Sequence, residues 1–176
     1  PDLKLGNDAI PRVDHHKHLG LIVDKHLTFD QHITELTKKI DKHLNPLKSL
    51  CRKVNGKHLE LIFKSFILPL FDYCDILYGC ANITKLKLID QLYYKAACIC
   101  SGVLHGTSST KVLNCLNWPN LSDRRHIHRM ILMYRVRNNT LPSYVLSVFN
   151  QYRRNLTSIT RKSRDYQIPV KISTFS

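Results

Sequence analysis

Apolar residues spaced three and four positions apart dominate the chain after about residue 30, and this spacing predicts helices. The first such pattern begins near Asp30 and is formed by Ile33, Leu36, Ile40, Leu44, Leu47, Cys51 and Val54. Gly56 is expected to lie just past the end of this helix, where a left-handed residue is often needed. Pro46 falls inside the pattern and predicts a kink or a break near Leu44, because proline has no amide hydrogen to donate.

A second apolar pattern predicts one continuous helix over residues 57–78, bent at Pro69 and closed by Gly79. Its apolar face consists of Leu59, Ile62, Phe63, Phe66, Ile67, Leu70, Phe71 and Cys74. A third helix is predicted to begin at Thr84, as its N-cap, and to stop near Gly102. Three shorter patterns predict helices over residues 110–116, 122–138 and 142–149, with Ser122 capping the second of these.

The N-terminal residues show strand-like patterns instead. Leu3 to Leu5 and Ile10 to Val23 are interpreted as two strands joined across Gly6-Asn7-Asp8, a composition typical of turns. Within the longer strand, Gly20 permits the close approach of another backbone or marks a β-bulge. The predicted fold is therefore mainly α, with a short N-terminal β-hairpin followed by a bundle of about five to six helices.

Three segments follow from this reading of the chain. Residues 1–28 form the hairpin, residues 29–150 the helical bundle, and residues 151–176 a basic, partly flexible tail. The tail mixes Arg with Ser and Thr and has no apolar period, although Ile168 to Ile172 could add an edge strand. The chain starts at Pro1 in the middle of a strand-like pattern, which favours a processed product or a piece of a longer polypeptide.

The charge balance changes the functional picture. The 27 Lys and Arg residues against 13 Asp and Glu give a net charge of +14. A field of this sign attracts polyanions, so nucleic acid is the leading partner and a merely solvated basic surface is the alternative. No apolar run is long enough to cross a membrane and no secretory signal pattern is present, so we expect no membrane partner and an intracellular location, in the cytoplasm, the nucleus or both.

Cysteine and histidine spacings do not predict a metal site. The six cysteines include no C-x-x-C pair, and Cys51, Cys74 and Cys115 fall on apolar helical faces, so we interpret the cysteines as small buried side chains. The histidines of the 15–18 and 126–128 segments have no carboxylate or cysteine at ligand spacing, and solvated or phosphate-facing histidines are favoured.

A catalytic centre is not predicted either. The segment Phe71-Asp72-Tyr73-Cys74-Asp75 superficially resembles a polymerase box, but its two carboxylates lie three residues apart in a helical pattern. They are expected on an exposed helix face or in salt bridges with Lys64 and Lys95, not on a pair of metal ions. No nucleophile elbow, P-loop or dinucleotide fingerprint is present, so we expect no intrinsic enzymatic activity, no catalytic residues and no cofactor in this chain.

Candidate binding residues are easier to find. Four lysines lie off the apolar stripe of the first long helix and could face a phosphate backbone: Lys38, Lys39, Lys42 and Lys53. The later helix carries one row of Arg124, His128 and Arg135 and a second row of Arg125 and Arg129, and simple solvation is the alternative for both. Tyr93 and Tyr94, next to Lys95, could stack on bases or fill a helix interface.

Four ordered motifs resemble one protein family. Lys17-His18-Leu19-Gly20-Leu21-Ile22-Val23-Asp24, followed by Leu27-Thr28-Phe29 and His32-Ile33, resembles the primer-grip strand and thumb entry of jockey-like non-LTR retrotransposon reverse transcriptases. Ser65 to Tyr73 is similar to the family's "sfi-x-P-x-x-e-Y" helix. Trp118 to His128 is similar to its "L-x-W-x-x-L-x-x-R-R-x-x-H" segment, and Leu141 to Phe149 to the "x-P-x-Y-L-x-x-x-f" element that follows. Together the motifs cover roughly residues 13–150.

This resemblance implies a primer-grip hairpin and a helical thumb and post-thumb region of an RNA-directed DNA polymerase. His18, Leu19 and Gly20 would then lie by the primer terminus, and the lysines of the first helix by the duplex backbone. The partners would be an RNA or DNA template-primer and the remainder of the polymerase. Its palm, with the carboxylates that bind divalent metal, would precede Pro1, so that this chain alone could not polymerise. A non-catalytic protein-interaction scaffold, or a decayed retroelement remnant, is the alternative.

Overall fold

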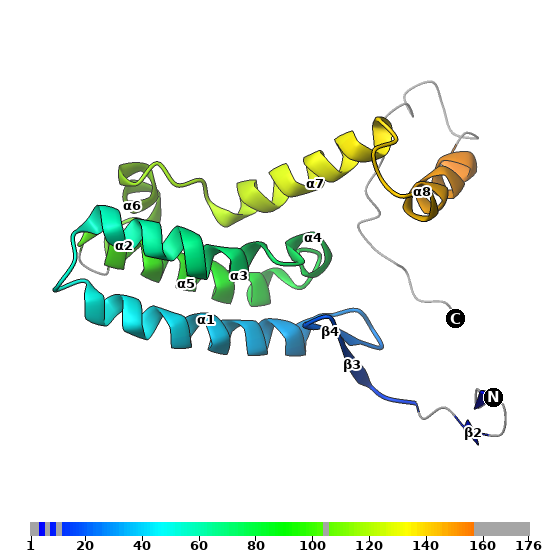
Figure 1. Ribbon diagram of the computed structural model, residues 1–176, viewed down its shortest axis with the longest axis horizontal. Coiled ribbons are helices and arrows are strands. Elements are labelled where there is room, and N and C mark those ends of the chain that lie inside the picture. Colours follow the sequence, from blue (N-terminus) through cyan, green and yellow to red (C-terminus); the bar gives the residue numbers. More distant parts are fainter. Residues whose placement is uncertain (1–3, 6–7, 10–11, 104–105, 157–176) are drawn as a thin grey trace. The chain divides into compact units, whose positions relative to one another are not determined.

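The computed structural model describes residues 4–5, 8–9, 12–103 and 106–156 (Figure 1). The chain divides into two compact units, Pro1–Pro119 and Asn120–Ser176, which are described separately. The predicted class is confirmed, since short strands near the N-terminus precede a mainly helical chain. Gly6 and Asn7 of the predicted turn, the predicted strand at 168–172 and the tail after residue 156 lie outside the described residues.

Two small antiparallel hairpins replace the predicted single one. β1 (Lys4–Leu5) pairs with β2 (Asp8–Ala9), and β3 (His15–His18) pairs with β4 (Leu21–Asp24). The prediction of one strand over residues 10–23 is therefore wrong. The chain reverses at Leu19-Gly20, whose φ angles are +47° and +88°, and two successive positive φ angles produce a two-residue hairpin turn. Gly20 is thus a turn residue and neither a bulge nor a glycine inside a strand.

Asp24 organises the connection from β4 to the first long helix. Its carboxylate accepts the backbone N–H groups of His26 and Thr28 at 3.0 Å and that of Phe29 at 2.7 Å, and also the Thr28 hydroxyl. Burial raises the pKa of Asp24, but these hydrogen bonds outweigh it and the pKa lies below its ordinary value. The side chain therefore fixes the loop from which the helix starts.

Helix α1 (Asp30–Leu50) begins where the sequence predicts and carries the predicted apolar stripe as far as Leu47, while Cys51 and Val54 of that stripe lie beyond its end. It passes through Pro46 without the predicted break. Pro46 removes one helical hydrogen bond near the C-terminal end, while Leu44 and Leu47 on either side of it are buried and hold the helix in place.

Gly56 was predicted to lie just past the end of α1. It instead begins α2 (Gly56–Ile62), after the N-cap Asn55. A Cβ atom added at Gly56 would lie 2.7 Å from the carbonyl oxygen of Cys100, closer than real Cβ contacts allow. The glycine is therefore explained by the close approach of α2 to the C-terminal end of a later helix, α5 (Ile83–Ser101).

The predicted helix over residues 57–78 is divided into α2, a π-helical turn η1 (Phe63–Ile67), α3 (Leu68–Asp72) and α4 (Asp75–Tyr78). Pro69 has no amide hydrogen for the preceding turn, and the Leu68 N–H instead bonds the carbonyl of Phe63, five residues earlier. The wider turn shifts which side chains face inward. Those buried recur at every fourth position: Leu59, Phe63, Ile67 and Phe71. Phe66, predicted to be in the core, is 73% exposed.

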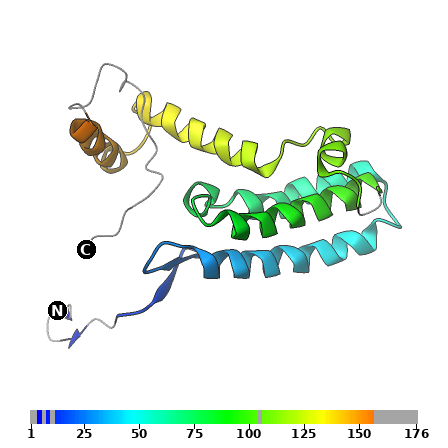
Figure 2. The same ribbon diagram turned by 180° about the vertical axis from the view of Figure 1, so that it is seen from behind.

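Helix α5 (Ile83–Ser101) runs parallel to α1 (Figures 1 and 2). Two ion pairs connect the helices, Lys85 with Asp30 at 3.9 Å and Lys95 with Asp41 at 2.6 Å. The N-cap is Asn82, whose side chain accepts the Thr84 N–H, and not Thr84 itself. The predicted end near Gly102 is confirmed by that residue's φ of +69°. Helix α6 (Ser109–Cys115) follows.

An aromatic cluster fills the centre of the first unit. Phe63 stacks on Trp118 at a centroid distance of 4.6 Å, and Phe71 and Tyr93 pack around them. The Trp118 indole N–H donates to the Glu60 carboxylate at 2.8 Å. These contacts attach the chain after α6 to α2, and they place Tyr93 in the core.

The cysteines correspond only in part to the prediction of buried side chains. All six are free thiols; Cys98 and Cys100 are buried, whereas Cys51, Cys80 and Cys115 are exposed. Cys51 follows the end of α1 and Cys115 is the last residue of α6, so neither packs on a continuing helix face. Burial raises the pKa of Cys100 to about 12.

The second unit contains α7 (Leu121–Arg137) and α8 (Ser143–Leu156). The side chain of Asn120, and not the predicted Ser122, caps α7 by accepting the Asp123 N–H at 2.8 Å. Helix α8 continues past the predicted end at Phe149 as far as Leu156. Within the described parts of both units, no helix has the length and apolar character needed to cross a bilayer.

Candidate nucleic-acid interface

The tip of the β3–β4 hairpin brings together three predicted site residues, His18, Leu19 and Gly20, all of them exposed. Leu19 is 79% exposed. The Tyr73 hydroxyl, from the break between α3 and α4, donates a hydrogen bond to the Leu19 carbonyl. The tip is therefore held by a tyrosine distant in sequence, and its side chains face solvent.

Strand β3 adds cationic and titratable groups to this tip. His15, His16, Lys17 and His18 are all exposed. An exposed run of this composition suits contact with phosphates, because each lysine and each protonated histidine contributes a positive charge.

His32, on α1, connects that helix to strand β4 of the hairpin. It is 5% exposed, and its Nδ1 accepts the backbone N–H of Ile22 in β4 at 3.4 Å. Its ring lies 5.5 Å from that of Tyr78. Burial lowers the pKa of His32, against an opposing effect of the Glu35 charge. The imidazole is therefore neutral and accepts through Nδ1, while Nε2 is buried without a hydrogen-bond partner among the described residues.

The lysines predicted on the first helix are exposed, but only three of them lie on α1. Lys38, Lys39 and Lys42 belong to it, and Lys38 and Lys42 project on the same side, one turn apart. Lys53 lies in the turn after the helix, because α1 ends at Leu50.

The cationic residues predicted in the second unit all lie on α7, with unequal exposure. Arg124, His128 and Arg129 are half-buried, whereas Arg125 is 7% exposed and presents little surface to a polyanion. The Arg129 Nε donates to the Arg125 carbonyl within the helix at 3.3 Å. Arg135 is exposed.

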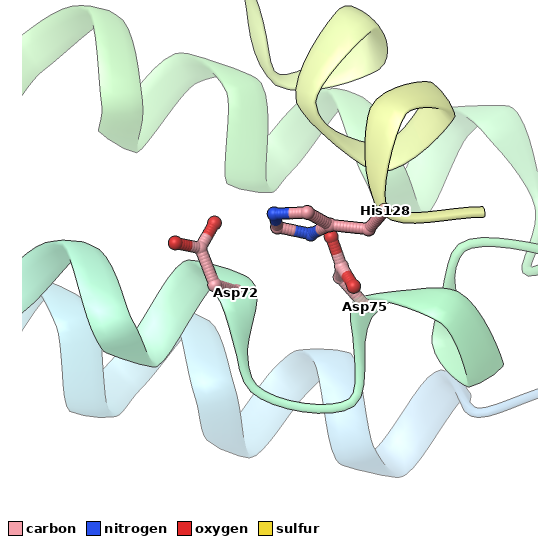
Figure 3. A group of neighbouring side chains, drawn as sticks. All are labelled: Asp72, Asp75 and His128. Carbon is pink, nitrogen blue, oxygen red and sulfur yellow. The ribbon is translucent and has the colours of Figure 1, made fainter. Parts of the chain in front are cut away.

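Asp72 and Asp75 do not share an exposed helix face as predicted. Figure 3 shows them on the two sides of the break between α3 and α4, where Cys74 has a φ of +58°. Asp75 is only 3% exposed. The predicted salt-bridge partners are also wrong, because Lys64 pairs with Glu60 at 2.6 Å and Lys95 with Asp41.

Three residues hold the β3–β4 hairpin or the loop that follows it, and the sequence did not predict this role for them: Asp24, His32 and Tyr73. A histidine directly before the apolar stripe of α1 was the available signal for His32. For Tyr73 no local signal existed, since its partner lies 54 residues away.

Comparison with known proteins indicates the origin of this chain. Over 106 residues it is 27% identical to a probable RNA-directed DNA polymerase from transposon X-element of Drosophila melanogaster. The chain resembles a retrotransposon polymerase. The alignment covers 58% of this chain and only 12% of that protein. No protein-family model matches the chain, and no solved structure matches it. The similarity supports a relationship to retrotransposon reverse transcriptases and does not by itself identify the region to which the chain corresponds.

Proposed function

We propose that this chain is a nucleic-acid-binding, thumb-like part of a retrotransposon RNA-directed DNA polymerase and holds the template-primer for a palm domain supplied by the rest of that polypeptide. The observation that carries the proposal is the exposure of basic residues in two segments of the first unit, which we call its basic surface. These segments are the β3–β4 tip and the part of α1 that carries Lys38, Lys39 and Lys42.

Two physical features make this surface suitable. The hairpin is held at two points, by Tyr73 at its turn and by His32 at β4. A fixed loop loses less conformational entropy when it binds than a free one. The lysines of α1 add charge along a rigid helix, where each phosphate neutralised releases counterions.

The test is the salt dependence of binding to a labelled RNA–DNA hybrid. We expect affinity to fall steeply as salt rises. Because each phosphate contact contributes roughly 0.9 to the slope of log affinity against log salt, Lys38→Ala/Lys42→Ala should lower that slope by up to about two. Lys87→Ala/Lys111→Ala, which removes two exposed lysines from α5 and α6, is the matched control and should change it less.

Salt-insensitive or absent binding by the unmodified chain would contradict the proposal. An equal loss of slope in both double variants would show that net charge, and not this surface, determines binding. Arg124→Ala/Arg129→Ala tests the second unit in the same assay, and we expect a smaller effect because both side chains are half-buried.

We propose further that the metal-binding carboxylates of the polymerase belong to a palm domain outside this chain. The 176-residue chain should then show no nucleotide incorporation on a primed template with Mg²⁺ or Mn²⁺. Metal-dependent extension that survives further purification would refute this part of the proposal.

A protein-interaction role is the second candidate. It is favoured by an exposed apolar stripe on α7, with members at i, i+3, i+4 and i+7: Ile127, Met130, Ile131 and Tyr134. Such a stripe is typical of a helix that packs on a partner. Self-association in sedimentation velocity without nucleic acid, abolished by Ile131→Glu, would support this role. A monomeric chain that binds nucleic acid would favour the first.

A further inference from the structure

A groove of about 660 Å³ lies between the parallel helices α1 and α5. Lys38 and Asp41 line it from α1, and Leu88, Leu92, Tyr94 and Lys95 line it from α5. Its volume is in the range of small-ligand sites, roughly 300 to 1,000 Å³. The groove joins an apolar and aromatic wall to charged groups.

Tyr94 is held in one position within this wall. Its hydroxyl donates to the Thr107 carbonyl at 2.6 Å and accepts the Gly106 N–H at 3.1 Å, both from the loop before α6. The side chain is half-buried, unlike that of the adjacent Tyr93, which is 3% exposed in the aromatic cluster. A ring fixed at its far end and lining an open groove is a ready stacking surface.

The charges of the groove favour an anion next to this ring. Lys38 is exposed and is one of the lysines on which the proposed function rests. Lys95 is 35% exposed and pairs with Asp41 at 2.6 Å. Two ammonium groups against one carboxylate leave the six named lining residues with a net positive charge.

We propose that this groove binds one unpaired nucleotide of single-stranded RNA or DNA, with its base against Tyr94 and Leu92 and its phosphate beside Lys38. The inference rests on the proposed function and deepens it, because it names a strand type and a position. A base within a duplex is stacked on both faces and has no free face to offer the tyrosine ring, so the groove discriminates in favour of unpaired nucleotides.

Photocrosslinking locates the contact directly. The full chain is mixed with a short oligouridine carrying one 5-iodouridine, irradiated and digested, and the adducts are mapped by mass spectrometry. We expect adducts at Tyr94 that a single-stranded competitor removes more effectively than a duplex of the same length. Adducts confined to the β3–β4 tip would overturn the proposal.

Affinity measurements provide an independent test. Since base–aromatic stacking contributes about 1 to 3 kcal/mol per base, Tyr94→Leu should weaken binding to the single-stranded oligonucleotide at least about fivefold. Binding to the hybrid duplex should change less than twofold. Tyr144→Leu removes an exposed tyrosine from α8 and should affect neither ligand.

A further variant guards against misfolding. Tyr94→Phe keeps the ring and should retain most of the single-strand affinity even though the hydroxyl's hydrogen bonds to Thr107 and Gly106 are lost. If Tyr94→Phe binds as weakly as Tyr94→Leu, or if both ligands weaken equally, stacking in the groove is contradicted. The proposed function has its own failing result: the unmodified chain does not bind nucleic acid, or binds it with an affinity that does not depend on salt.

Discussion

Replacement of His32 by leucine tests whether one buried imidazole holds the β3–β4 hairpin to α1. The variant removes the acceptor for the Ile22 N–H and keeps an apolar side chain against Tyr78. Ile22 is only 4% exposed, so its amide would be left without a partner away from water. A buried donor left unsatisfied costs about 1 to 3 kcal/mol, and we expect the variant's free energy of unfolding to be lower by this amount at pH 7.5.

The pH dependence separates this effect from a packing defect. Burial lowers the pKa of His32 in the folded chain, so the unfolded chain takes up its proton first, near pH 6.5. The stabilisation by neutral His32 is therefore complete above about pH 6.5 and is lost as the pH falls toward the folded pKa. For one proton, the free energy of unfolding changes by at most about 1.4 kcal/mol per pH unit.

The difference in the free energy of unfolding between the unmodified chain and His32→Leu should thus become smaller from pH 7.5 to pH 5. Exposed histidines are common to both proteins and cancel in the difference. Urea unfolding followed by the fluorescence of Trp118, the chain's one tryptophan, measures it. Amide exchange at Ile22 should also be faster in the variant. A difference that stays constant from pH 8 to pH 5 would refute a neutral, hydrogen-bonded His32.

Three further substitutions test other parts of the first unit by urea unfolding. Gly56→Ala places a Cβ 2.7 Å from the Cys100 carbonyl oxygen and should lower the free energy of unfolding by about 1 to 3 kcal/mol. An unchanged free energy of unfolding would mean that α2 can move away from α5 without cost. Gly102→Ala meets no atom within 4 Å but occupies a φ of +69°, so we expect only the strain of about 1 to 2 kcal/mol. Asp24→Ala removes the acceptor of four hydrogen bonds and should cost about 1.5 to 3 kcal/mol at pH 7. Because the folded pKa of Asp24 is lowered, this contribution is present above about pH 4 and disappears as the pH falls through the folded pKa; an equal cost at pH 7 and at pH 2 would contradict it.

The helical pattern was sufficient to predict where α1 starts and where α5 ends. In α1, five buried apolar side chains recur three or four positions apart, and this pattern alone determines the apolar face of the helix: Ile33, Leu36, Ile40, Leu44 and Leu47. The prediction failed where one residue changes the local geometry. Pro69 induces a π-turn that places Ile67 in the core and Phe66 in solvent, and a fixed helical period cannot anticipate this shift.

The candidate site was predicted less completely than the fold. The exposed lysines of α1 were found because they oppose the apolar stripe. The hairpin turn at Leu19-Gly20 was missed, since leucine rarely adopts a positive φ and its neighbours resemble a continuous strand. The different environments of Tyr93 and Tyr94 depend on the loop at residues 106–107, which the sequence does not place beside α5.

Three side-chain links described above have consequences for truncation of the chain. Tyr73 to Leu19, Lys95 to Asp41 and Trp118 to Glu60 each join residues separated by 54, 54 and 58 positions. The three intervals overlap, so no cut between Leu19 and Trp118 leaves all of them intact. We therefore expect the minimal autonomously folding fragment to extend from β3 through Trp118, and limited proteolysis within that interval to release no stable smaller piece.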